Sequence, residues 1–221
     1  MTDAINLPHR RGGTSPAGKD ASAPSEPAAF AAAVESMYQV RLRPEIARGT
    51  IRPPQRLAPF SHAIGLEVDR HPGQDTPTPP ENSTDTEGDA FGRLIALYDP
   101  HGTEHDGDIR LVAYIQADMD SAVAADPMLP DVAWEWLTEA LASASATYTD
   151  LGGTVTSTAS VRFGDIGGVP RAHQLEMRAS WTVNLETSSD LGPHILAFSQ
   201  LLASVAGLPP EGVATLKQPR T

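Results

Sequence analysis

Cysteine is absent from the 221 residues, and this absence excludes several kinds of site. Without a thiol the chain has no disulfide, no thiolate nucleophile and no cysteine-ligated zinc or iron–sulfur cluster. No run of about 18 apolar residues is present to span a bilayer. The first twenty residues also lack the apolar segment of a secretory signal, so the expected location is the cytoplasm and no membrane is expected as a partner.

Basic residues are scarce, with 16 Lys and Arg against 28 Asp and Glu, which gives a formal net charge of −12. This charge argues against a general binder of nucleic acid, because nucleic acid is a polyanion. Five arginines nevertheless fall in one short stretch that contains a single acid, Glu45: Arg41, Arg43, Arg48, Arg52 and Arg56. They either bind an anionic partner or pair with the protein's own carboxylates, and the second explanation is the simpler.

Catalytic motifs are also absent. The glycines near residues 152 and 167 do not fit GxGxxG or the P-loop pattern, and the chain has no GxSxG, HExxH or SxxK. Residues 101–108 include several side-chain types that bind metals, but polar residues are normal in such a turn. We therefore expect no metal and no cofactor, and the sequence favours a non-enzymatic protein.

Apolar spacing predicts a single α+β domain over residues 27–208. Helical spacing occurs at 27–42, 130–148 and 189–207, and strand-like runs occur at 62–68, 92–99, 108–117, 154–163 and 174–183. The order α-β-β-β-α-β-β-α favours an antiparallel sheet of about five strands with helices packed on one face. Outside this core we expect a disordered tail at 1–26, a flexible acidic loop rich in proline and threonine at 70–89, and a C-terminal tail at 209–221.

Two histidines, His62 and His173, fall on the apolar side of their strands, where an imidazole needs a hydrogen-bond partner or stays neutral. If the two strands were neighbours, these histidines and Glu176 would line one pocket of a small hydrolase or ligand-binding enzyme. The simpler interpretation is two partly buried structural histidines at strand ends. The enzyme is therefore an alternative hypothesis.

Trp136 lies off the main apolar stripe of its helix, about 160° around the axis from Trp134. Either the N-terminal helix covers this side, or Trp136 belongs to a contact surface. Prolines 53, 54 and 59 stiffen the approach to the next strand, which would display Arg52, Arg56 and Phe60.

The leading hypothesis is a binding or adaptor protein with an unknown protein partner, and a homodimer is a further expectation. Its candidate contact residues are Arg43, Arg48, Arg52, Arg56, Phe60 and Trp136. An accessory role in RNA processing, through the arginines of 41–56, is another alternative.

Three runs resemble a family of small actinobacterial proteins described as a domain of unknown function: AVESMYQVRLRPEI, PPQRLAPFSHAIGLEV and RLIALYDP. The resemblance covers the chain from about Ala28 to Leu208. It implies an actinobacterial protein without an assigned reaction, cofactor or site. The order of elements is also similar to that of acidic secretion-chaperone-like domains, which are dimeric α+β binding proteins, but this analogy concerns the fold alone.

Overall fold

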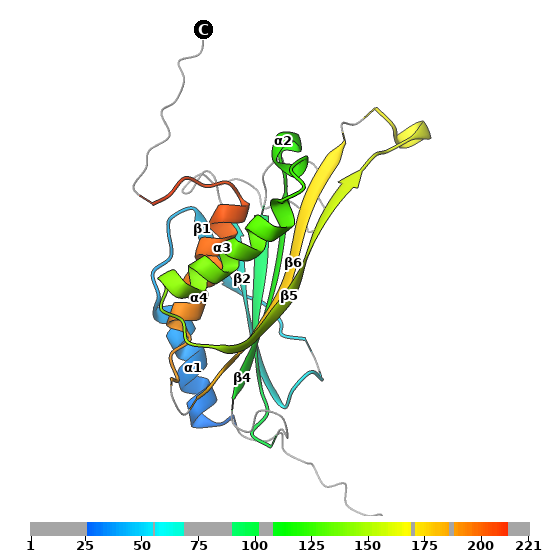
Figure 1. The fold of residues 1–221 in the computed structure, drawn as a ribbon. Coiled ribbons are helices and arrows are strands. Elements are labelled where there is room, and N and C mark those ends of the chain that lie inside the picture. The colour runs from blue at the N-terminus through cyan, green and yellow to red at the C-terminus, as the bar shows by residue number, and fades with distance from the viewer. Residues whose placement is uncertain are drawn as a thin grey trace, which may run out of the picture.

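The computed structural model describes residues 26–54, 56–68, 90–101, 108–168, 171–185 and 188–211. These residues form one antiparallel sheet of six strands, with the long helices packed on one face (Figure 1). The predicted α+β class is therefore confirmed. Most of both predicted tails, the loop at 70–89 and residues 102–107 lie outside the described residues.

The strands lie across the sheet in the order β1-β2-β3-β4-β6-β5. Their bounds are β1 (Ile46–Thr50), β2 (Phe60–Val68), β3 (Ala90–Tyr98), β4 (Ile109–Asp118), β5 (Thr149–Ser160) and β6 (Ala172–Val183). The helices are α1 (Ala28–Gln39), α2 (Ser121–Ala124), α3 (Leu129–Ser143) and α4 (Gly192–Val205), and a 3-10 turn lies at Gly164–Ile166.

Strand β1 and helix α2 differ from the sequence prediction, which contained neither. Only Ile46 of β1 is buried, so this edge strand lacks the apolar alternation by which the other strands were found. Helix α2 is one turn of four residues and buries none of them. Both elements are too short and too exposed to leave a periodic signal.

The core lies between the sheet and the helices. In β4 every second residue from Ile109 to Ala117 is buried, and the residues between them are half-buried. Helix α4 is buried along most of its length because it packs against α1, α3 and the sheet. Its contact with β3 is tight: a Cβ atom on Gly92 would lie 2.6 Å from Cζ of Phe198. None of the described helices combines the length and the apolar character that a membrane crossing needs.

Candidate binding surface

Arg48 stabilises the protein's own fold. Its Nη1 donates to the carbonyl oxygens of Met37 at 2.8 Å and Val40 at 3.1 Å, and its Nη2 donates to that of Tyr38 at 2.8 Å. These carbonyls are at the end of α1, where the last turn of a helix lacks intrahelical donors. The guanidinium therefore caps α1, and three of its five N–H donors are already used.

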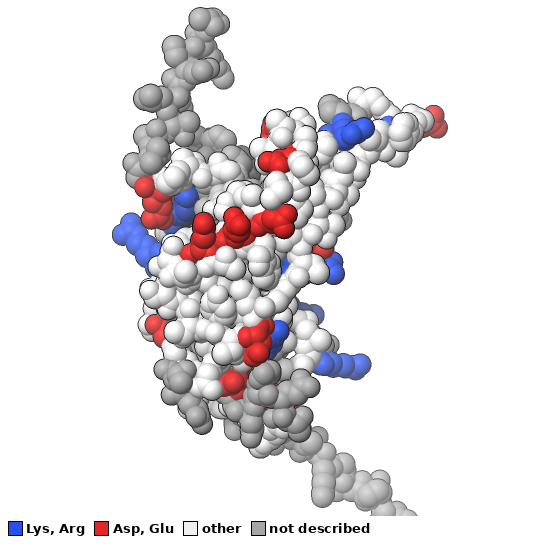
Figure 2. All heavy atoms as spheres, viewed as in Figure 1, with Lys and Arg blue, Asp and Glu red and all other residues white. Residues whose placement is uncertain are grey.

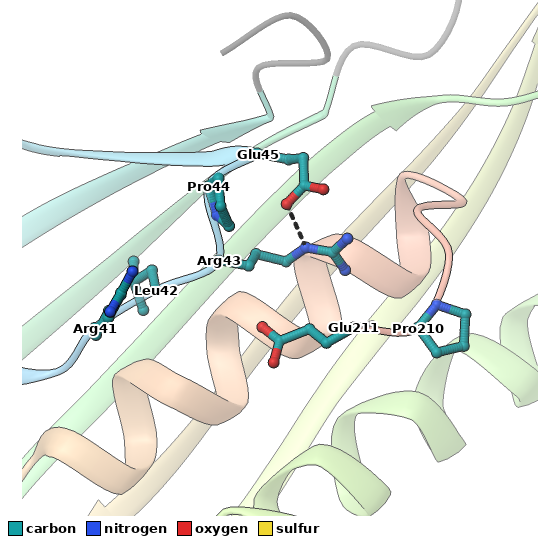
Figure 3. A pocket seen from close by; sticks show the side chains of 7 residues that line it. All are labelled: Arg41, Leu42, Arg43, Pro44, Glu45, Pro210 and Glu211. Atoms are coloured by element: carbon teal, nitrogen blue, oxygen red, sulfur yellow. Dashed lines mark hydrogen bonds and ion pairs between the residues drawn. The ribbon is translucent and has the colours of Figure 1, made fainter. Parts of the chain in front are cut away.

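Arg43 lies in a pocket of about 330 Å³ between the α1–β1 connection and the residues after α4 (Figure 3). Its Nε donates to Oε2 of Glu45 at 3.0 Å, and its Nη1 donates to the carbonyl of Pro209 at 3.1 Å. The first of these hydrogen bonds lowers the pKa of Glu45. Arg41 and Glu211 are the other charged residues that line the pocket, so its lining contains two guanidiniums and two carboxylates. The pocket offers an anion no excess positive charge.

The register of the sheet does not bring together the residues of the predicted histidine pocket. Strands β3 and β4 separate β2 from β6. Across the sheet, His62 lies in the same row as Trp181 of β6. His173 lies eight positions before Trp181 on β6, so the rows of the two histidines are about 25 Å apart along the strand direction. Glu176 points to the opposite face from His173, since side chains alternate along a strand. The enzyme hypothesis built on this pocket has no structural basis.

His62 instead joins α1 to the sheet. Its Nε2 lies 2.7 Å from Oη of Tyr38, and the same hydroxyl lies 2.7 Å from Oγ1 of Thr50. Burial lowers the pKa of His62, because the charged imidazolium loses its hydration. This is the structural role that the sequence offered as the simpler interpretation.

The two candidate aromatic residues also pack inward. The Phe60 ring lies 6.4 Å from the ring of Phe30 and 6.3 Å from that of Tyr98, between centroids, so it is half-buried and not displayed as predicted. Trp136 is half-buried against the core. Helix α3 packs mainly on α4 and β5, so the N-terminal helix is not its main cover.

Arg52 and Arg56 remain exposed, and Leu57 beside them is 61% exposed. The connection that carries them begins at Ile51, whose side chain packs against Gly65. A Cβ atom added to Gly65 would lie 3.1 Å from Cγ2 of Ile51. Gly65 faces away from the helices, because its neighbours Ile64 and Leu66 face the core. The connection therefore starts on the helix-free side of the sheet.

The charges of the helices are all acidic, whereas the helix-free face of the sheet carries charges of both signs (Figure 2). The four described helices contain no Lys or Arg, and α3 carries Asp131, Glu135 and Glu139 on its exposed side. Figure 2 shows acidic atoms in a row along α3, and basic atoms both on the side away from the helices and at the edge near β1.

The arginines of β3, β4 and β6 lie on the helix-free face of the sheet. Arg110 is used internally, because its guanidinium donates to Thr182 at 2.8 Å and to Ser180 at 2.7 Å. Arg93 and Arg178 are exposed. In the register of the sheet, Arg93 on β3 and Arg178 on β6 both lie opposite Tyr114 on β4, one on each side of it. These two are the open-face arginines that an anionic partner would meet.

Arg93 and Arg178 each lie against an aromatic ring. The guanidinium of Arg93 lies 5.7 Å from the centroid of Phe91, and that of Arg178 lies 5.7 Å from the centroid of Tyr114. The two rings are 6.0 Å apart. Arg178 also pairs with Glu176 at 2.9 Å, and the Tyr114 hydroxyl donates to Glu176 at 3.0 Å. Burial, followed by this hydrogen bond, raises the pKa of Tyr114.

We call this surface the arginine face and define it by Phe91, Arg93, Tyr114 and Arg178, together with the half-buried Ile95 and Val112 beside them. The sequence alone does not single out this surface. The alternation of β4 does place Arg110, Val112 and Tyr114 on one side, but both sides of this strand are apolar enough to suggest burial. Only the register brings Arg93 and Arg178 to the same tyrosine.

A family model described as a protein of unknown function (DUF3000) matches residues 26–214. The chain belongs to this family. The DUF3000 match spans every described helix and strand, in agreement with the resemblance found in the sequence, and it supplies no reaction or ligand. No curated protein and no solved structure matches the chain. The actinobacterial origin stays a prediction.

Proposed function

We propose that this DUF3000 chain is a non-enzymatic binding protein that holds an acidic, extended segment of a partner protein on its arginine face. The observation that carries the proposal is a difference in charge: the helices carry no Lys or Arg, whereas the open face exposes Arg93 and Arg178, which lie among the acids Glu67 and Glu176. An anionic segment is repelled by the acidic row on α3 and is attracted to the side where Arg93 and Arg178 are exposed. The cytoplasmic location expected from the sequence is part of the same proposal.

The arginine face has the composition of a contact surface as well as its charge. Ile95 and Val112 lie opposite each other on β3 and β4 and are half-buried, so a partner would remove the rest of their surface from water. An exposed ion pair contributes only about 0.2–1 kcal/mol. The apolar centre would therefore supply most of the affinity, and the arginines would select an acidic partner.

The test uses a labelled peptide of alternating glutamate and valine, about ten residues long, a lysine–valine peptide of the same length, and a labelled oligouridine. Fluorescence anisotropy measures each dissociation constant for the wild type, for R93E/R178E and for R41E/R171E. The last variant makes the same charge change at two exposed arginines outside the arginine face. We expect the wild type and R41E/R171E to bind the acidic peptide, and R93E/R178E to lose at least about tenfold in affinity.

Equal binding of the acidic peptide by R93E/R178E and R41E/R171E would refute the proposal, as would no binding by the wild type. The exposed Arg52 and Arg56 keep the RNA-accessory role as a second candidate. Tight binding of oligouridine that weakens steeply with salt, without binding of the acidic peptide, would favour that role instead. Affinity purification from the native host, with and without nuclease, then identifies the natural partner.

A further inference from the structure

Strand β5 is the last strand of the sheet and has a free edge. It pairs with β6 on one side, and no backbone hydrogen bond within the described residues reaches its other side. It is also long, with 12 residues. Its backbone N–H and C=O groups along that edge are therefore available to pair with another strand.

The two edges of the sheet differ in how they are protected. Strand β1 has only five residues, contains Arg48, and leads into Arg52, Pro53 and Pro54. Short length, charge and proline are the features by which natural edge strands avoid pairing. Strand β5 has a bulge near Thr149 and Gly152, but from Gly152 to Ser160 it has neither charge nor proline. The segment TVTSTAS, 154–160, is rich in β-branched residues and is exposed except at Val155.

The hairpin of β5 and β6 projects from the body of the molecule (Figure 1). Beyond Ser160 its turn exposes three large apolar side chains: Val161 by 44%, Phe163 by 79% and Ile166 by 69%. A soluble domain seldom exposes several such side chains together unless they contact a partner. The free edge and the apolar turn therefore indicate, independently, that this hairpin is an interface.

We propose that two copies of this chain pair through β5 in an antiparallel arrangement centred on Thr156. The strand is complementary to itself in this register. Thr156 lies opposite Thr156 of the second copy, and Thr154 lies opposite Thr158, so a threonine ladder forms on the helix-free face. No like charges meet, because the paired stretch carries none.

The residues beyond the paired stretch also match. Counted along the chain in the same register, Val161, just after β5, falls near the half-buried Leu151 of the second copy, which lies in the bulge between Thr149 and Gly152. By the same count Arg162 falls near Asp150, and both are exposed, so opposite charges lie on each side of the dimer axis. This self-complementarity is the reason to choose a second copy, and not an unrelated strand, as the occupant.

The dimer joins two six-stranded sheets into one continuous sheet and brings the two arginine faces to the same side. Pairing through β5 does not depend on what the arginine face binds. Dimerisation and peptide binding are measured separately, so the failure of one proposal leaves the other in place.

Sedimentation equilibrium of the full chain tests the proposal with T156K, T156E, their equimolar mixture and A47K. Thr156 is exposed, so neither substitution buries a charge, but T156E places a carboxylate opposite Glu176 of the same chain, and circular dichroism therefore checks that both variants fold. We expect a dimer for the wild type and monomers for T156K and T156E, since two like charges would face each other at the axis. The mixture restores a dimer, because lysine then faces glutamate. A47K places the same charge on the opposite edge and stays dimeric.

A monomeric wild type, or a dimer that survives in T156K, would overturn the proposal. A mixture of T156K and T156E that remains monomeric would overturn the register centred on Thr156. The absence of cysteine from the chain allows a second measurement on the same point. Single cysteines placed in turn from Thr154 to Ser160 should cross-link best at T156C, and cross-linking that is equal at all positions would contradict the pairing.

Discussion

Burial of a histidine makes the stability of this fold depend on pH. The side chain of His194, near the start of α4, is only 1% exposed. Its Nδ1 accepts a hydrogen bond from Nε1 of the buried Trp181 at 3.1 Å, so this nitrogen carries no proton. Burial lowers the pKa of His194 to about 4, because the imidazolium would lose its hydration, and Asp190 opposes this shift only in part.

The size and direction of the effect follow from proton linkage. Above about pH 6.5 the imidazole is neutral in both the folded and the unfolded chain, and its neutral form causes no loss of stability. Between about pH 6.5 and 4 the unfolded chain binds a proton that the folded chain does not. The free energy of unfolding therefore falls as the pH falls, by about 1.4 kcal/mol per pH unit. From neutral pH to about pH 4.5 the loss is about 2–3 kcal/mol.

Urea unfolding followed by circular dichroism, at about pH 7.5, 6.0 and 4.5, measures this loss. The matched variant is H194N, whose amide oxygen takes the place of Nδ1 as the acceptor for Trp181 but does not titrate. H194N is less stable at every pH because it leaves a cavity, but its stability should fall by about 2–3 kcal/mol less than that of the wild type. Equal pH dependence of the two proteins would refute the reasoning.

Three further predictions concern packing, capping and charge. G92A should lower the free energy of unfolding by about 1–3 kcal/mol, because the new methyl group meets Phe198, whereas G49A, with no atom within 4 Å of its Cβ, should not lower it. Thermal unfolding of the two variants checks this, and equal melting temperatures would contradict it. R48M should cost about 1–3 kcal/mol in urea unfolding, since three carbonyls at the end of α1 lose their donor. R52M at an exposed arginine should change stability by less than about 0.5 kcal/mol, and an equal cost would show that Arg48 does not cap α1. Arg43 lowers the pKa of Glu45, so the stability that this ion pair contributes is lost when Glu45 is protonated at low pH. E45Q should therefore flatten the fall in the free energy of unfolding below about pH 4.5, and an unchanged pH profile would contradict this.

The parts of the fold that the sequence predicted are those with a strong period. Leu175, Met177, Ala179, Trp181 and Val183 alternate along β6, and all five are buried as expected. Helix α4 shows the same agreement between apolar spacing and burial. Such patterns are local, because each strand or helix displays its buried face in its own residues.

The candidate site depends on contacts between distant segments, which no local pattern in the sequence predicts. Arg48 has the same local surroundings as the other arginines of its stretch, but the end of α1 lies against it and takes its donors. Arg93 and Arg178 are 85 positions apart, and only the register through Tyr114 makes them neighbours. His62 and His173 show the reverse, since a shared pattern in two strands did not make those strands adjacent.

The two proposals differ in their response to salt. Each copy carries a formal charge of −12, so pairing through the uncharged β5 works against long-range repulsion between the copies. Salt screens this repulsion beyond about 10 Å at 0.1 M, and the dimer should therefore tighten as salt is added. Binding of an acidic segment depends on Arg93 and Arg178, so added salt should weaken it. If the peptide and the second copy competed for one surface, the two constants would be linked, and the apparent affinity for the peptide would fall as the protein concentration rises. On separate surfaces the affinity of each chain for the peptide does not change with protein concentration.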